Sequence, residues 1–164
     1  MPLVTLTDDQ IMLAEQIANK RVLAGKNKVS RVFVGQPLTD ELRHKIDYLG
    51  VVSELAVSLF LGLPWESKDG IGDSDVGGFE VRSTQREDGK NYFLYVREYD
   101  KDAIYIYCIV DVPYVVIAGW AGAWQVRNLG ALMFTDTNAY GLPRAKLNPM
   151  SQLAEVAEFA SRKC

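Results

Sequence analysis

Acidic side chains, a glycine pair and an acid–base pair are concentrated in one short stretch, GDSDVGGFEVRST, at residues 72–84. Its second half alternates as a β-strand does, which places Phe79 and Val81 on one face and Glu80 and Arg82 on the other. A strand with a purely structural role has little need for an acid and a base side by side on one face. The pattern therefore marks this strand as a candidate for chemistry.

Other carboxylates accompany this strand. Asp73 and Asp75 precede Gly77-Gly78, where the missing side chains let the backbone turn tightly or let another group approach. An ordinary hairpin turn would also suit these aspartates, and the acid–base pair could be a cross-strand charge ladder. Glu54 lies in the apolar stretch GVVSELAVSLFLGLPW, and a buried carboxylate is costly unless it is paired or bound to a metal. Taken alone, Glu54 is better explained by exposure to solvent or by a salt bridge than by a metal.

Taken together, the carboxylates indicate a cation site. They would converge if the helix that carries Glu54 packs on the sheet that begins at the hairpin. Three carboxylates in one place repel one another, and a hard divalent cation relieves that repulsion. Oxygen-rich sites suit Mg²⁺. The residue types therefore predict a magnesium site made by Glu54, Asp75 and Glu80.

Hydrophobic periodicity predicts the elements that would position these residues. One helix should begin at Thr7–Asp9 and end near Gly25, a second helical stretch opens at Thr39–Asp40, and a mostly buried helix follows Gly50. Four strands in an antiparallel meander and a closing helix in NPMSQLAEVAEFASRK should follow; the strands are expected at about 76–84, 91–98, 103–111 and 114–121. This order predicts an α+β fold, with residues 1–164 forming a single domain.

Composition restricts the classes of protein that the chain can belong to. Its 164 residues are 48% hydrophobic and 24% charged, which is typical of a globular domain and excludes a disordered one. The formal net charge of −3 argues against a protein that binds duplex DNA through an overall positive charge. A local basic groove is still compatible with this charge.

The cysteines and the apolar segments indicate the cellular compartment in which we expect the protein. Cys108, inside the run AIYIYCIV, should be a buried reduced thiol, and no cysteine spacing indicates disulfides or zinc. The N-terminus lacks a signal-peptide pattern, and no apolar run reaches transmembrane length. We therefore expect no membrane partner and a cytoplasmic protein.

The layout resembles that of the PD-(D/E)XK nuclease superfamily, and small phage-encoded members in particular. The residues that carry the resemblance are Glu54 in its helix, Asp75, the triplet Glu80-Val81-Arg82, and the IAGW stretch at 117–120. The motif is short, and its helix–hairpin–strand context over residues 49–124 raises its specificity. The resemblance implies a restriction-endonuclease-like core, a mainly antiparallel or mixed sheet flanked by helices.

The resemblance also implies roles for these residues in hydrolysing phosphodiester bonds of DNA. Asp75 and Glu80 would bind Mg²⁺ or Mn²⁺, with the backbone carbonyl of Val81 as a further ligand. Glu54 would hold a water or a second ion. The metal would polarise the phosphate and generate hydroxide for in-line attack, while Arg82 stabilises the added negative charge.

Arg82 stands where the family pattern usually has lysine. Arginine stays charged and presents a planar fork to phosphate oxygens, so Arg82 could hold a phosphate but could not act as a general base. The alternative is therefore a catalytically inactive nuclease-fold module that binds DNA or protein. An unrelated α+β domain with surface carboxylates is a third interpretation.

Further residues could contact nucleic acid. Gln85, Arg86 and Lys90 follow the triplet and could meet the DNA backbone, although Gln85 is explained equally well as an exposed polar residue near a turn. A second basic run begins at Lys20-Arg21, and a solvated face explains it equally well. Trp120 and Trp124 could stack on bases, although aromatic residues in strand-rich domains more often belong to the core. The resemblance also makes a homodimer an open expectation, because small nucleases of this type often pair to address two strands.

Overall fold

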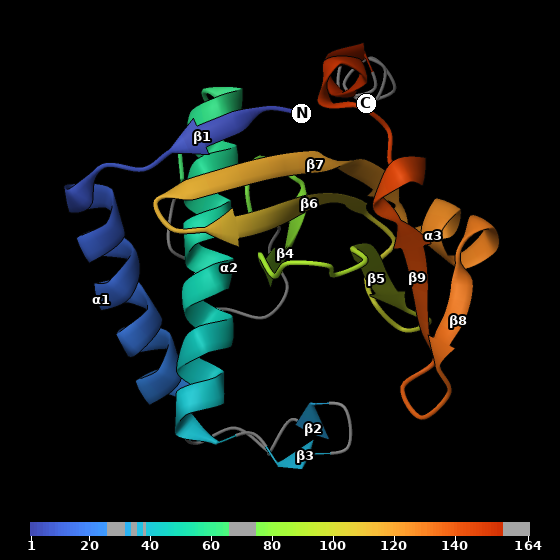
Figure 1. The fold of residues 1–164 in the computed structure, drawn as a ribbon, viewed down its shortest axis with the longest axis horizontal. Helices are drawn as coiled ribbons and strands as arrows, with labels where there is room; N and C mark the ends of the chain where they lie inside the picture. The colour runs from blue at the N-terminus through green and yellow to red at the C-terminus, as the bar shows by residue number, and fades with distance from the viewer. Residues whose placement is uncertain (26–31, 34–35, 38, 66–74, 156–164) are drawn as a thin grey trace.

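A pair of helices and a mixed sheet form one side of the molecule in the computed structural model, which describes residues 1–25, 32–33, 36–37, 39–65 and 75–155 (Figure 1). Helix α1 (Asp8–Gly25) lies beside the longer helix α2 (Asp40–Leu61), which packs across the sheet. No helix among the described residues is long and apolar enough to cross a membrane. The helix expected from Thr7 to Gly25 is confirmed.

Helix α2 joins two stretches that the sequence separated at Gly50. The Thr39 hydroxyl accepts a hydrogen bond from the Leu42 N–H at the start of the helix, and Gly62 ends it in the left-handed conformation with φ 65°. Glycine within a helix costs about 1 kcal/mol relative to alanine. Burial of the turns that follow, from Val51 to Ser58, offsets this cost, so the helix continues through Gly50.

The central sheet has four strands in the order β1-β7-β6-β4: β1 (Leu3–Thr5), β4 (Glu80–Gln85), β6 (Ile104–Asp111) and β7 (Tyr114–Gly122). Strands β6 and β7 pair antiparallel, as do β1 and β7, but β4 pairs with β6 in parallel. The expected antiparallel meander is therefore wrong at this point, and the sheet is mixed. The reason is that β5 (Phe93–Arg97) leaves the central sheet, so the chain returns to β6 in the direction of β4.

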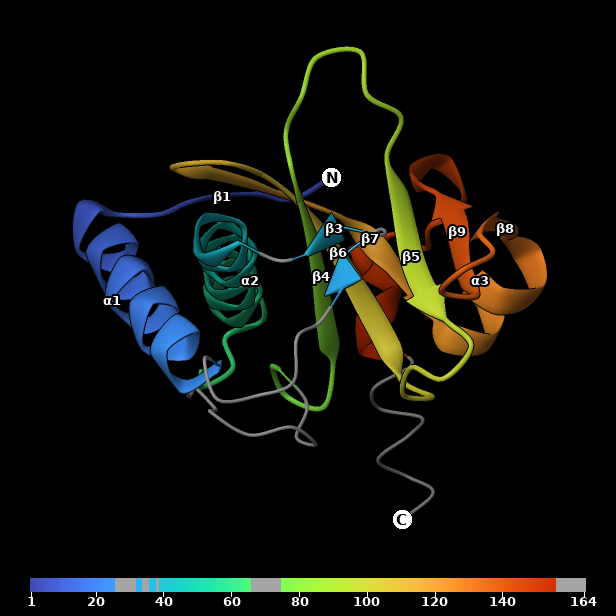
Figure 2. The same ribbon diagram turned by 90° about the horizontal axis from the view of Figure 1, so that it is seen from below.

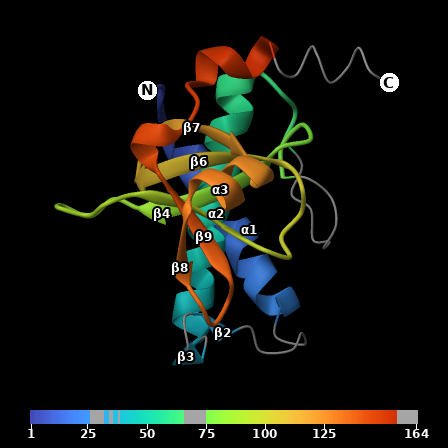
Figure 3. The same cartoon turned by 90° about the vertical axis from the view of Figure 1, so that its right-hand side faces the viewer.

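A second, antiparallel sheet covers the opposite face of the central sheet, as Figures 2 and 3 show. It has the order β5-β9-β8, with β8 (Ala131–Phe134), β9 (Ala139–Pro143) and the short helix α3 (Ala123–Leu129) beside it. Sequence periodicity missed these last three elements. A separate two-stranded pair, β2 (Val32–Phe33) with β3 (Gln36–Pro37), lies between the two helices in the chain.

Strand β6 belongs to both hydrophobic clusters of the protein. Ile106 and Cys108 face the cluster that contains α1 and α2, whereas Tyr105 and Tyr107 face the cluster that contains α3, β5 and β9. Burial on both faces explains the unbroken apolar run of this strand. Cys108 is a buried free thiol, as expected.

The second half of the expected closing helix lies outside the described residues. The chain forms one short 3-10 turn at Arg144–Lys146 and another at Met150–Gln152, where the side chains of Met150 and Leu153 reach the core beside the helices. Residues 156–164 are not part of the described structure. The fold as described is α+β, with a mixed sheet and an antiparallel sheet flanked by helices.

Candidate functional site

The candidate site lies at the start of β4, which forms an edge of the central sheet. Val76 and Phe79 exchange backbone hydrogen bonds of 3.1 and 2.8 Å, which closes a tight hairpin just before the strand. Gly77 and Gly78 occupy its tip with φ values of 53° and 90°, a region that favours glycine. The hairpin brings Asp75 back alongside β4, where its Oδ2 accepts a 2.7 Å hydrogen bond from the Val81 N–H.

The backbone direction at Val81 determines what faces Asp75. The N–H and C=O of one strand residue point to the same side of the strand, so the Val81 carbonyl shares the Asp75 side of β4. The backbone groups of the even-numbered residues point to the opposite side, toward β6. The Arg86 N–H, for example, donates a 2.7 Å hydrogen bond to the Val110 carbonyl of β6. The carboxylate and the carbonyl therefore both lie at the open edge of the sheet.

Asp75 is an electrostatically stressed carboxyl group. Its pKa is raised from 3.8 to about 6, first because burial penalises the charged form and then because the carboxylates of Glu54 and Glu80 repel it. The hydrogen bond from Val81 and the charge of Arg82 only partly oppose this. The carboxylates are thus near enough to influence one another.

Glu54 is buried and fully engaged by protein groups. Its two carboxylate oxygens each accept a 2.9 Å hydrogen bond from the Arg21 guanidinium of α1, and Trp65 Nε1 donates another at 3.2 Å. The side chain is only 8% exposed, and the same contact raises the pKa of Arg21. Glu54 therefore links α1 to α2, as the salt-bridge interpretation of the sequence expected.

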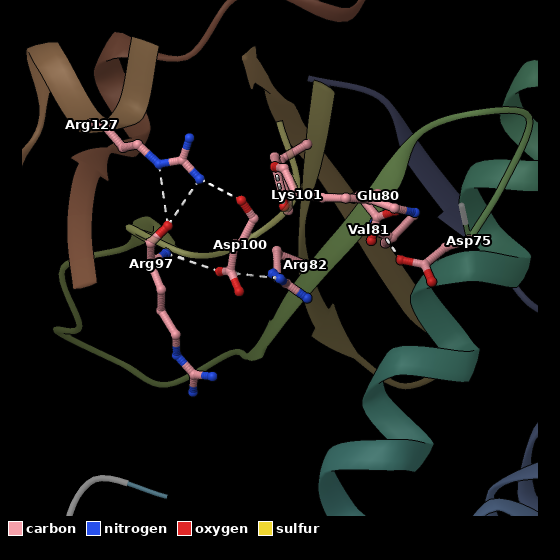
Figure 4. Close-up of polar contacts among 9 residues, drawn as sticks. Asp75, Glu80, Val81, Arg82, Arg97, Asp100, Lys101 and Arg127 are labelled. Carbon is pink, nitrogen blue, oxygen red and sulfur yellow. Dashed lines mark hydrogen bonds and ion pairs between the residues drawn. The ribbon is translucent and has the colours of Figure 1, made fainter. Parts of the chain in front are cut away.

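Glu80 and Arg82 lie on the other face of β4 from Val81, as the alternation predicts (Figure 4). Lys101, which precedes β6, places its Nζ 3.0 Å from Glu80 Oε1. Sequence reasoning missed Lys101, because no motif connects it to the triplet and only the parallel β4–β6 pairing brings the two together.

Arg82 contacts an acid and an aromatic ring. Its Nη2 lies 3.5 Å from Asp100 Oδ2, and its guanidinium carbon lies 5.1 Å from the centre of the Tyr105 ring. Asp100 Oδ2 also accepts a 2.9 Å hydrogen bond from the Arg97 N–H. Figure 4 shows this acid and base network continuing to Arg127, whose guanidinium donates to the carbonyls of Arg97 and Asp100.

The site residues are thus distributed around the first half of β4. Asp75 lies between Glu54, on the α2 side of the strand, and Glu80, on the other side. No group of three or more His, Cys, Asp or Glu side chains in the described part of the chain is arranged to hold a metal ion. The smaller oxygen-rich set consists of Asp75 and the Val81 carbonyl, with the Glu80 carboxylate on the neighbouring face of β4.

The residues expected to meet DNA extend from the same strand. Gln85, Arg86 and Lys90 are all exposed; Arg86 lies 3.6 Å from Asp111, and Lys90 lies 3.0 Å from Glu87. In the second basic run Arg21 serves the Glu54 pair, and residues 26–31 lie outside the described structure.

The tryptophans differ in exposure. Trp120 is 8% exposed and donates to the Pro149 carbonyl, which makes it a core residue, whereas Trp124 is 63% exposed. Trp124 lines a hollow of about 580 Å³ together with Asp102 and Asn148.

Comparisons with known proteins identify no relative. No protein-family model, no curated protein and no solved structure matches the chain.

Proposed function

We propose that the chain is a Mg²⁺-dependent nuclease that hydrolyses phosphodiester bonds of DNA on a restriction-endonuclease-like core. The observation that carries the proposal is the position of Asp75, held by the Val81 N–H and repelled by Glu54 and Glu80. Cytoplasmic location and DNA as the partner belong to the same proposal.

The donor set suits a hard cation. Asp75, Glu80 and the Val81 carbonyl offer oxygen atoms only, which Mg²⁺ and Mn²⁺ prefer, and a cation would relieve the repulsion that raises the pKa of Asp75. Glu80 would exchange its Lys101 contact for the ion, and Glu54 would remain with Arg21 or orient a water. A site with few protein ligands is ordinary for Mg²⁺, which keeps several waters.

The chain's residues would divide the hydrolysis among them. A bound Mg²⁺ supplies Lewis-acid polarisation of the phosphate and a more acidic water. Asp75 and Glu80 would hold the ion and, through it, the reacting phosphate and water. A positively charged side chain on the Glu80 face of β4 would stabilise the added negative charge. The water oxygen bonds to phosphorus as the opposite P–O bond breaks, giving a phosphomonoester and an alcohol. The water loses one proton to solvent, and the leaving oxygen gains one.

Linear and circular DNA incubated with the protein and Mg²⁺ or Mn²⁺ would test the proposal. We expect cleavage that EDTA abolishes and that Asp75→Ala and Glu80→Ala each reduce at least ~100-fold. Asp136→Ala, in the exposed turn between β8 and β9, is the matched control and should leave the rate unchanged. Cleavage that persists in both site variants, or no cleavage with either metal, would overturn the proposal.

A second candidate is a non-cutting module that binds DNA or protein on the same scaffold. It is favoured by Arg82 in place of lysine and by the protein partners that Glu54 and Glu80 already have. Gel-shift and calorimetry assays separate the two functions. DNA binding without metal-dependent turnover supports this module, whereas Mg²⁺ binding that is lost in Asp75→Ala, together with turnover, rules it out.

A further inference from the structure

A lysine from outside the motif occupies the position next to Glu80. Lys101 Nζ lies 3.0 Å from Glu80 Oε1, with the Lys101 side chain 42% exposed and Glu80 only 12% exposed. The ammonium group is thus in contact with a sheltered carboxylate and still reaches solvent. A phosphate that approached the Glu80 face of β4 would meet this ammonium beside the Glu80 carboxylate.

The backbone that carries Lys101 is held firmly. Arg127 of α3 donates to the Arg97 carbonyl at 3.1 and 3.2 Å and also to the Asp100 carbonyl. The hydroxyl of Tyr105, a residue that is 1% exposed, donates to the Lys101 carbonyl at 2.9 Å. These contacts fix the turn before β6, so the lysine side chain starts from a defined point near Glu80.

Arg82, in contrast, supports that turn. Its guanidinium faces Asp100 and lies over the Tyr105 ring, and Asp100 also caps the Arg97 N–H. Asp100 partly offsets the charge of Arg82, and the Tyr105 ring lies against its guanidinium, although the Arg82 side chain is 41% exposed, as much as that of Lys101. Arginine is well suited to combined stacking and ion pairing of this kind.

We propose that Lys101, rather than Arg82, is the cation that contacts the phosphate in this site, and that Arg82 positions the turn that carries it. This inference rests on the proposed nuclease function. As the P–O bond to the attacking water forms and the opposite P–O bond breaks, the ammonium of Lys101 stabilises the charge on the non-bridging oxygens. Lys101 keeps its protons throughout, so the proton balance of the hydrolysis is unchanged.

The test compares four variants with the wild-type protein in two assays, DNA cleavage and Mg²⁺ binding by calorimetry. Lys101→Met should lower the cleavage rate ~100-fold, the effect of removing one electrostatic contact to a transition state. It should bind Mg²⁺ at least as tightly as wild type, because no ammonium then competes for Glu80. Lys101→Arg should stay within ~10-fold of wild type, because the charge is retained.

Arg82→Met should lower the thermal unfolding midpoint yet keep cleavage within ~10-fold of wild type, and Arg82→Gln, which also removes the charge, replaces it if the methionine variant does not fold. Lys45→Met, at an exposed position of α2, is the matched control and should leave both readouts unchanged.

The outcomes separate this inference from the function on which it rests. A wild-type protein that does not cut DNA overturns the nuclease proposal and this inference with it. If wild type cuts and Lys101→Met cuts equally well, only the inference fails. It fails as well if Lys101→Met weakens Mg²⁺ binding more than ~10-fold, because Lys101 would then help to build the metal site, or if folded Arg82→Met loses as much cleavage as Lys101→Met.

Discussion

At the scale of single residues, Asp75 is a carboxyl group whose pKa lies well above its ordinary value. Its carboxylate is partly buried, accepts the Val81 N–H, and lies where Glu54 and Glu80 repel it. A protein keeps such a group at a cost to its own stability. Electrostatic stress of this kind is common where a charged ligand is to be bound.

The stability cost of Asp75 should depend on pH. Its folded pKa is raised to about 6 from 3.8, so between these values the unfolded chain binds fewer protons than the folded one, and this group lowers the free energy of unfolding as pH rises. We expect Asp75→Asn to be more stable than wild type at pH 7.5 by about 1–2 kcal/mol, after discounting for partial exposure. The difference should vanish near pH 4.

Urea denaturation of both proteins across this pH range provides the measurement. Added Mg²⁺ should stabilise wild type, by about 2.7 kcal/mol at one hundred times its dissociation constant, and should leave Asp75→Asn unchanged. An Asp75→Asn variant that is less stable than wild type at pH 7.5 would contradict the assigned environment of this carboxyl group.

At the scale of elements, the contact between α1 and α2 and the pairing of β4 with β6 build the site. The Arg21–Glu54 pair joins the two helices, and the parallel pairing places Lys101 beside Glu80. Each of these contacts links residues at least 21 positions apart in the chain. Tertiary arrangement, rather than local sequence, therefore completes the site.

Breaking the helix–helix ion pair should destabilise the protein strongly. Glu54→Ala would leave the Arg21 charge, whose side chain is 19% exposed, without its partner, at a cost of about 3–5 kcal/mol. Glu15→Gln is the matched control, because Glu15 also links the helices, 3.0 Å from His44, but is 49% exposed. It should change stability by less than ~1 kcal/mol. Equal effects of the two variants in urea denaturation would show that the Glu54 pair is not a buried link.

Sequence patterns predicted much of this arrangement and missed the rest for identifiable reasons. Alternation placed Val81 and Glu80 on opposite faces, and helical periodicity located α1. The alternation of apolar and polar residues could not predict that β5 joins a second sheet, because it indicates which face of a strand is buried and not which strand is its neighbour. Lys101 was invisible for the same reason, since its contact with Glu80 exists only through the β4–β6 register.

At the scale of the whole molecule, the described layers place the site on an outer strand of the central sheet. Helices cover one face of the central sheet and the β5-β9-β8 sheet covers the other, whereas β4 is an outer strand of the central sheet (Figures 1 and 2). The net charge is −3, so attraction of DNA must come from local groups of basic residues, among which we expect those near this edge to act.

DNA binding should therefore depend only moderately on salt. If Lys101, Arg86 and Lys90 meet about three phosphates, the logarithm of the binding constant should fall with the logarithm of salt concentration with a slope of about −3. Fluorescence anisotropy of labelled DNA, with Ca²⁺ in place of Mg²⁺, would measure this slope at several salt concentrations. A slope near −8 would indicate a much larger basic surface and would contradict a contact confined to this edge.

The most direct test of the central claim is the anomalous diffraction of crystals soaked in Mn²⁺. The account predicts one peak at the open edge of β4, within coordination distance of an Asp75 carboxylate oxygen, a Glu80 carboxylate oxygen and the Val81 carbonyl, about 2.0–2.3 Å from each. Such a peak should be absent from crystals of Asp75→Asn. Crystals that bind no Mn²⁺, or bind it away from Asp75 and Glu80, would contradict the metal site and the nuclease built on it.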